Sequence, residues 1–170
     1  NVYITPIKSP LNVLYEDDYL IAVEKQRGQL THSSRYNGGV SLEQLVCGYF
    51  APKPFVFRAI NRLDKDTRGV VLIAKNAYTA SLLGSQMKAG LIKKTYLAVV
   101  VGTPTKKHFI IEKPIKRQSE NSIKRTVCDD GEYAKTECTV IENLEGNLSL
   151  LSILLHTGRT HQIRVHLSSV

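Results

Sequence analysis

The sequence contains no tryptophan, a single methionine and only three cysteines. The cysteines, Cys47, Cys128 and Cys138, are odd in number and far apart, and no two of them form a C-x-x-C pair. This pattern argues against a disulfide framework and against a thiolate zinc site. It fits a reducing compartment, so we expect the protein to be cytoplasmic.

Long apolar runs are also missing, since none approaches the roughly 18 residues that a membrane span needs. The first residues lack the charged-then-apolar layout of a signal peptide. The sequence has no Gly-rich phosphate loop, nucleophile elbow or dinucleotide fingerprint. We therefore expect no membrane contact, and an enzyme with this sequence would work without a nucleotide cofactor.

Acidic residues are few relative to basic ones: 15 against 23, for a net charge of +8. Such a balance is expected of a nucleic-acid-binding domain, although a basic protein without such a partner has it too. With 170 residues, 42% hydrophobic and 22% charged, the chain fits one globular domain spanning residues 1–170. It starts without methionine and stops inside a segment with a helical pattern, so we expect a piece of a longer polypeptide.

Short β-prone runs outnumber helical segments and are joined by short turns rather than by regular β-α-β units. This pattern predicts an α+β fold with a central mixed, mostly antiparallel β-sheet flanked by helices and loops. We expect strands at residues 13–15, 19–23, 30–32, 55–60, 70–74, 94–101, 109–111, 125–127, 136–141 and 148–155. The first two should form a hairpin around the acidic turn at residues 16–18, which ends at residues 25–28.

Local signals mark three helices, at residues 41–50, at residues 76–88 and from residue 160 onward. Ser41 opens the first with a capping box, and Asn76 can cap the second. The buried side of the second helix would hold Leu82, Leu83 and Met87. One face of the third would hold Ile163, Leu167 and Val170.

A charged loop at residues 62–69 interrupts two apolar, strand-like runs. Its five charged side chains are those of Arg62, Asp64, Lys65, Asp66 and Arg68. A charged turn between strands would place reactive groups on a rigid base. Taken alone, however, an aspartate in a loop most often stabilises a turn.

Three histidines, His156, His161 and His166, recur every five residues. Neither a strand nor a helix gathers side chains with this spacing on one face, and the i, i+4 pair of a helix-borne zinc site is absent, so we expect no metal site. Two histidine-hydroxyl dipeptides, at residues 32–33 and 156–157, leave open a ribonuclease-like general acid and base.

Residues 61–75, NRLDKDTRGVVLIAK, strongly resemble the signature H-R-L-D-x-x-T-S-G-x-x-x-x-A-K of the RluA-type (RluA, RluC and RluD-like) RNA pseudouridine synthases. The chain departs from it at Asn61, where the family has histidine, and at Arg68, where it has serine. Both departures bear on the identity of the substrate. Further segments resemble the other family motifs in the family's order: residues 13–25 with Gly28 and His32, 93–102, 130–136 and 155–167.

The resemblance implies the pseudouridine synthase fold and the isomerisation of specific uridines in structured RNA, an rRNA or tRNA stem-loop, after base flipping. No group or electron is exchanged in this reaction, so neither a cofactor nor a metal is expected. Asp64 is by resemblance the essential catalytic carboxylate. Attack on the sugar carbon, addition to the base and abstraction of a ribose proton all remain open as its role.

Other residues acquire roles by the same resemblance. Tyr96 would stack on the base or transfer a proton, although an ordinary core tyrosine would fit the strand pattern equally well. Arg164 would hold the catalytic carboxylate, with phosphate binding as the alternative. Arg62 would fill the space left by the flipped nucleotide. Ile163 would form an apolar wall of the base pocket. The remaining residues assigned to RNA binding are Arg159, His161 and Lys94.

A basic surface would contact RNA phosphates, and each neutralised phosphate should steepen the dependence of affinity on salt. Its residues are Lys93, Lys94, Lys113, Lys116, Arg117, Lys124 and Arg125. We expect a monomer. The family's domain normally continues beyond the point where this sequence stops, so by resemblance we expect its C-terminal part to be missing. The competing hypothesis is a non-catalytic RNA-binding module of the same fold, which the two departures from the signature and this truncated end motivate.

Overall fold

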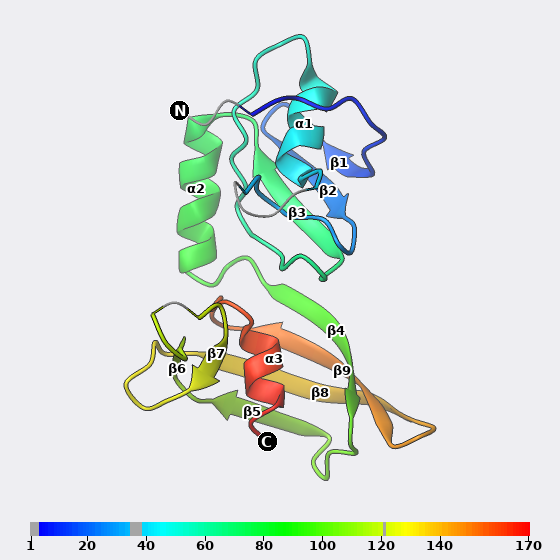
Figure 1. The fold of residues 1–170 in the computed structure, drawn as a ribbon, viewed down its shortest axis with the longest axis vertical. Helices are drawn as coiled ribbons and strands as arrows, with labels where there is room; N and C mark the ends of the chain where they lie inside the picture. The colour runs from blue at the N-terminus through cyan, green and yellow to red at the C-terminus, as the bar shows by residue number, and fades with distance from the viewer. Residues whose placement is uncertain (1–3, 35–38, 121) are drawn as a thin grey trace. The chain divides into compact units, whose positions relative to one another are not determined.

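The structure is a computed structural model that describes residues 4–34, 39–120 and 122–170. The chain forms two compact units, Asn1–Ala89 and Gly90–Val170 (Figure 1). Within the described residues, no helix is both long and apolar enough to cross a membrane.

The first unit is built on a three-stranded antiparallel sheet in the order β1-β2-β3. Its strands are β1 (Val13–Glu16), β2 (Leu20–Lys25) and β3 (Gly69–Ala74). The expected β1–β2 hairpin is confirmed. Asp17 stabilises its acidic turn, because one of its carboxylate oxygens accepts hydrogen bonds from the N–H groups of Tyr19 and Leu20, each at 2.8 Å. The central strand β2 is buried along most of its length, which gives the unit its core.

Two helices accompany this sheet, α1 (Leu42–Phe50) and α2 (Ala77–Lys88). The predicted capping box is confirmed: the Gln44 N–H donates to the Ser41 hydroxyl at 3.2 Å, and the Ser41 N–H donates to the Gln44 side chain at 3.0 Å. The predicted cap by Asn76 is confirmed too. The predicted buried side of α2 is wrong at Leu82, which is 47% exposed. Small and polar residues dominate this helix, so it has little apolar surface to bury.

The strand expected at residues 55–60 does not form. The segment runs beside β3 with only a few backbone hydrogen bonds, from the Ile60 N–H to the Leu72 carbonyl at 2.8 Å and from the Ala74 N–H to the Arg58 carbonyl at 2.9 Å. β-propensity reflects the fit of a side chain to a half-buried pleated surface. Val56 is 60% exposed, so that surface is missing here. The strand expected at residues 30–32 is likewise reduced to one isolated bridge.

The second unit contains a four-stranded antiparallel sheet in the order β4-β9-β8-β5 and a separate two-stranded ribbon, β6–β7 (Figure 1). The α+β prediction is confirmed, and all strand pairs among the described residues are antiparallel. The strands of this unit are β4 (Lys94–Val101), β5 (His108–Glu112), β6 (Ile115–Arg117), β7 (Arg125–Val127), β8 (Lys135–Leu144) and β9 (Leu148–Leu155).

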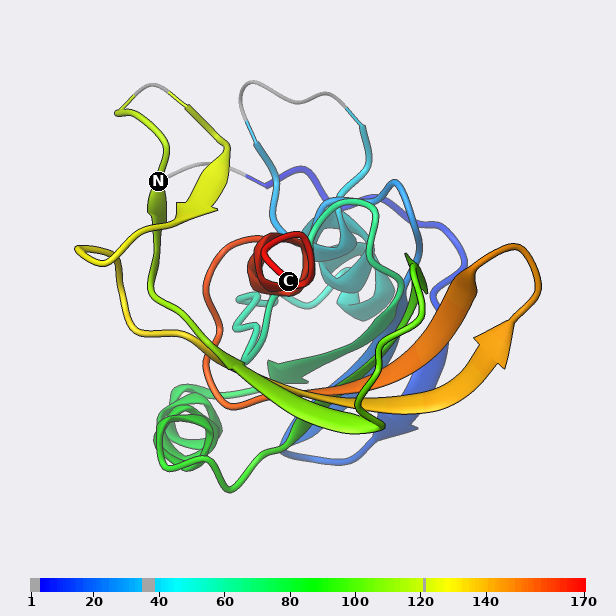
Figure 2. The ribbon, with the colours of Figure 1, turned by 90° about the horizontal axis from the view of Figure 1, so that it is seen from below.

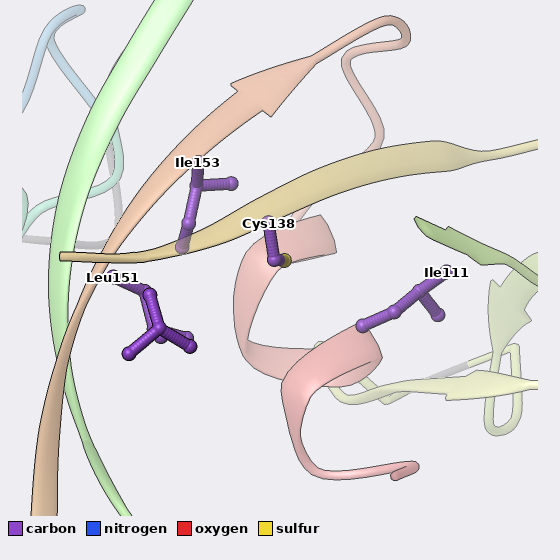
Figure 3. Packing of buried hydrophobic residues seen from close by; sticks show 5 residues of the cluster. Ile111, Cys138, Leu151 and Ile153 are labelled. Atoms are coloured by element: carbon purple, nitrogen blue, oxygen red, sulfur yellow. The ribbon is translucent and has the colours of Figure 1, made fainter. Parts of the chain in front are cut away.

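A short helix, α3 (Gln162–Leu167), lies over one face of the four-stranded sheet (Figure 2). Its Ile163 and Leu167 pack against the core as predicted, whereas Val170 is 73% exposed and lies beyond the end of the helix. The core beneath it is shown in Figure 3. Its buried residues are Ile111, Cys138, Val140, Leu151 and Ile153.

Polar side chains also attach α3 to the sheet. The Gln162 amide donates to the Thr136 hydroxyl at 2.9 Å, and that hydroxyl lies 2.8 Å from Nδ1 of His166. Nε2 of His166 lies 2.9 Å from the Lys113 carbonyl, which can only accept. Nε2 of His166 therefore carries a proton, and burial, which lowers the pKa of this histidine, favours the neutral ring in which Nδ1 accepts from Thr136. Because all three side chains are fully or almost fully buried, this network fixes the position of α3.

Protonation of His166 is expected to destabilise the second unit. Burial lowers the pKa of this histidine below its ordinary value of 6.5, so the unfolded chain binds the proton more readily than the folded one. Stability should be complete above about pH 6.5 and should fall as the pH drops through the folded-state pKa, by at most about 1.4 kcal/mol per pH unit. Urea unfolding of the wild type and of His166→Gln between about pH 8 and about pH 5 checks this. The variant should lose less stability than the wild type, and equal losses would contradict the assignment.

Candidate functional site

The charged loop of the first unit is fixed at its start by a buried threonine. The Thr31 hydroxyl donates to the Leu63 carbonyl at 2.9 Å and accepts from the Leu63 N–H at 3.3 Å. Leu63 itself is buried, and Asp64 follows it directly as a half-buried residue. The Thr67 N–H donates to the Asp64 carbonyl at 3.0 Å and closes the turn. The main chain on both sides of the Asp64 carboxylate is therefore held in place.

A buried lysine at the end of β2 also holds the main chain of this loop. Lys25 is completely buried, and its ammonium group donates to the carbonyls of Gln26 at 3.0 Å, Gln29 at 2.7 Å and Lys65 at 3.0 Å. Burial lowers the pKa of Lys25, whereas the negative charges of Asp66 and Asp64 oppose that shift. Lys25 thus joins the end of β2 to the loop and places a cation in the electrostatic environment of Asp64.

The expected hairpin accounts for Lys25 only as a residue at its end and does not predict this contact. A signal was available, because alternation along β2 puts Lys25 on the same face as the buried Ile21 and Val23. A lysine on a buried face must find acceptors for its ammonium group. Thr31 had no comparable signal in the sequence.

Both departures from the family signature have structural partners. The Asn61 side chain donates to the Val70 carbonyl at 3.0 Å and accepts from the Leu72 N–H at 2.9 Å, so it ties the start of the loop to β3. Arg68 donates from Nε to Glu24 at 2.8 Å. Hydrogen bonds from Arg68, which has the larger effect, and from Asn12 lower the pKa of Glu24 to about 2. Arg62, between Asn61 and Asp64, is exposed.

Tyr96 lies on β4 in the second unit. Alternation along β4 leaves Leu97 exposed and turns Tyr96 to the inner side, where it is half-buried, opposite Ile153, and packs against the core. The strand pattern alone does not fix the direction of Tyr96. A tyrosine at the edge of a core can present both a ring face and a hydroxyl.

Arg164 and His161 lie at α3, the first exposed and the second half-buried. Both line a cavity of about 470 Å³ between α3 and β7. Ile163 lies on the core side of the same helix. Asp64 belongs to the first unit, whereas Tyr96 and Arg164 belong to the second, so the convergence of these three residues on one nucleoside stays a prediction.

Lys94 and Arg159 have partners inside the second unit. The Lys94 ammonium group donates to the Thr157 carbonyl at 3.2 Å, and burial lowers its pKa. Arg159 donates to the Tyr133 carbonyl at 2.9 Å and to the Glu132 carboxylate at 3.0 Å. These contacts fix the segment that leads into α3, so both side chains have a structural role in addition to any contact with RNA.

The histidine-hydroxyl dipeptides lie in different units. His156 contacts Glu137 at 2.9 Å, and Glu137 also contacts His108 at 3.0 Å. His32 lies 3.8 Å from Glu43 and makes an edge-on contact with Phe57. Among the residues that the structure describes, no group of three or more histidine, cysteine or acidic side chains is arranged to hold a metal ion.

Residues 19–169 match the family model described as RNA pseudouridylate synthase. The chain is 35% identical over 161 residues to "Uncharacterized RNA pseudouridine synthase YjbO" of Bacillus subtilis (strain 168), covering 94% of this chain and 56% of the relative. It is 36% identical over 163 residues to "Ribosomal large subunit pseudouridine synthase D" of Nitrosomonas europaea, covering 95% of this chain and 47% of the relative. The chain thus spans about half the length of the curated relatives it matches.

The fold is similar to that of a solved structure, "Human RNA Pseudouridylate Synthase Domain Containing 1", with a TM-score of 0.78 and 24% identity. That comparison covers 94% of this chain and 65% of the human one. The family match extends over both units, from β2 to the residues after α3. On these matches and on the motif that carries Asp64, the chain belongs to the RNA pseudouridylate synthase family and is of the RluA type.

Proposed function

We propose that this protein isomerises specific uridines in structured RNA, rRNA or tRNA, to pseudouridine, with Asp64 as the essential carboxylate. The observation that carries the proposal is the construction of the Asp64 loop. Thr31 and Lys25 hold its backbone from the buried side, and Asp64 is left only half-buried. Rigid support of a reactive group lowers the cost of placing it against a substrate.

The reaction needs little beyond such a carboxylate. The bond from N1 to the ribose carbon C1′ breaks, the base rotates, and C5 forms a bond to the same C1′. A proton leaves C5 and N1 gains one, so the composition of the nucleoside does not change. Attack on C1′, addition to the base and removal of a ribose proton each use an ionised aspartate, the usual form of this side chain at neutral pH. We therefore propose a reaction that requires no cofactor.

The second unit would supply the partners of Asp64. In this proposal the Tyr96 ring stacks on the base or its hydroxyl takes part in proton transfer at C5, and the Arg164 guanidinium orients the carboxylate. The target base must leave its stack at a cost of a few kcal/mol, and the exposed Arg62 is placed to fill the gap. Further RNA contacts are assigned to Ile163, Arg159, His161 and Lys94.

Residues 1–170 would lie within one catalytic domain, and the protein would act as a monomer. It would work in the cytoplasm, in keeping with the free thiols of Cys47, Cys128 and Cys138. Burial raises the pKa of Cys138 to about 11, so this thiol is a core residue rather than a reactive one.

The alternative, a non-catalytic RNA-binding module, gains no support from the two departures that motivated it. Asn61 and Arg68 both hold the loop by side-chain hydrogen bonds.

One assay separates the synthase, the binding module and the ribonuclease. Ribosomal RNA and tRNA transcripts carrying tritium at C5 of uridine are incubated with the protein, and tritium release and strand length are measured. We expect release of tritium with intact strands. Strand scission would identify a ribonuclease. If no transcript shows tritium release or strand scission, the binding module is the remaining hypothesis and the proposed synthase is overturned.

A further inference from the structure

A basic cavity in the second unit is lined by residues of the β6–β7 ribbon on one side and of α3 on the other. Its volume is about 470 Å³, within the range of small-ligand sites. Lys124, Arg125 and Thr126 contribute to one wall, and His161 and Arg164 contribute to the other. None of the segments that resemble family motifs includes residues 118–127, so family resemblance assigns no role to the ribbon wall.

The charges around the cavity favour an anion. Lys124, Arg125 and Arg164 are cations at neutral pH, and His161 adds ring nitrogens. Ser168 contributes a hydroxyl at the other end of the helix wall. Among the described residues that line the cavity, none is acidic.

Arg125 points more specifically to a ligand. Its Nη1 is buried and has no hydrogen-bond partner within the described part of the chain. A buried donor without an acceptor is destabilising, and a bound anion would satisfy it. Arg125 also pairs directly with Arg117 in the ribbon register, and two cations in such a position repel each other. An anion beside them would relieve this repulsion as well.

The two walls of the cavity are connected to each other. Lys113, which precedes β6, donates from its ammonium group to the Ser169 carbonyl at 2.7 Å, while its own carbonyl accepts from His166. The base of the ribbon is thus tied to both the buried face and the end of α3. A cavity with fixed walls binds a ligand without first ordering its own residues.

We propose that this cavity binds a backbone phosphate of the substrate RNA, with Arg125 as its principal donor. The inference rests on the proposed function, because RNA is the substrate that would present a phosphate beside Arg164. A guanidinium group matches phosphate geometry with two parallel hydrogen bonds. The ribbon would thereby set the path of the strand next to the target uridine.

The test is the salt dependence of RNA binding by Arg125→Gln. We expect roughly tenfold weaker binding of a tRNA or rRNA transcript than for the wild type, as for the loss of one charge-assisted hydrogen bond. The slope of log affinity against log salt should become less steep by about 0.7–0.9, the value for one phosphate. Arg125→Lys should restore the slope but only part of the affinity, because it keeps the charge and loses the fork.

Lys106→Gln is the matched control, because Lys106 is an exposed cation of the same unit that does not line the cavity. Its affinity and slope should stay at the wild-type values. Circular dichroism and urea unfolding verify that Arg125→Gln is folded. Wild-type affinity and slope for a folded Arg125→Gln would overturn the proposal.

A titration with inorganic phosphate separates a free-phosphate site from an RNA contact. Saturable phosphate binding that Arg125→Gln abolishes, together with unchanged RNA binding, would overturn the assignment to RNA. Failure of the proposed function is distinguishable, because the binding measurement does not require turnover. If the wild type releases no tritium but Arg125→Gln has the less steep slope, the proposed function fails and the assignment of the cavity stands. If the wild type releases tritium but Arg125→Gln has the wild-type slope, the assignment of the cavity fails and the proposed function stands.

Discussion

The Asp64→Asn variant is expected to lose turnover by roughly a thousandfold or more, because it removes the charge of the group that acts on the nucleoside. Its affinity for RNA should remain within a few-fold of the wild type, since contacts to phosphates contribute most of that affinity. The asparagine keeps the size of the side chain, and Thr31 and Lys25 hold the loop backbone through their own hydrogen bonds. Tritium release from C5-labelled transcripts and filter binding measure the two quantities.

Asp66→Asn provides the matched control on the same loop. Asp66 is exposed, and its substitution removes the same charge two residues away. We expect its turnover to stay within a few-fold of the wild type. Comparable losses in the two variants would indicate that the charge of the loop, and not the Asp64 carboxylate, is required. Turnover by Asp64→Asn would show that the role was assigned to the wrong residue.

Lys25→Met should lower the free energy of unfolding by about 3 kcal/mol. It removes three hydrogen bonds to main-chain carbonyls at a fully buried position, where unsatisfied acceptors are costly. One of those carbonyls belongs to Lys65, directly after Asp64, so we also expect turnover to fall. Urea unfolding followed by circular dichroism gives the stability, and tritium release gives the turnover.

Lys65→Met serves as the control for the loss of a lysine charge at this loop. Its side chain is exposed, and its carbonyl, which accepts from Lys25, is unaffected by the substitution. Its stability should change by less than about 0.5 kcal/mol, as for most surface substitutions. Equal stability of Lys25→Met and the wild type would contradict the supporting role of the buried ammonium group.

Secondary structure was predictable wherever its signal was local. The capping box at Ser41, the Asn76 cap and the β1–β2 turn are formed by residues within four positions of each other, and all are present. Predictions that depended on packing were less successful. Val56 is an exposed residue in an extended segment, and Leu82 lies on an exposed part of α2, because nothing in either local sequence specifies what packs against it.

The candidate site also combines features with a local sequence signal and features that depend on packing. The motif around Asp64 could be recognised from the order of residues along the chain. The residues that hold it could not, because Thr31 meets Leu63 across 32 positions and Lys25 meets Lys65 across 40. Arg125 was only one of several basic residues in the sequence. Its buried donor and the cavity in front of it depend on the packing of the ribbon beside α3.

The most direct test of the account is to count pseudouridine after reaction with protein that has been dialysed against a chelator. Transcripts labelled at C5 are incubated with this protein alone, digested to nucleosides and separated by chromatography. We predict one pseudouridine for each tritium released, with no strand cleaved and no product when Asp64→Asn replaces the wild type. Tritium release without pseudouridine, or pseudouridine formed equally by Asp64→Asn, would contradict it.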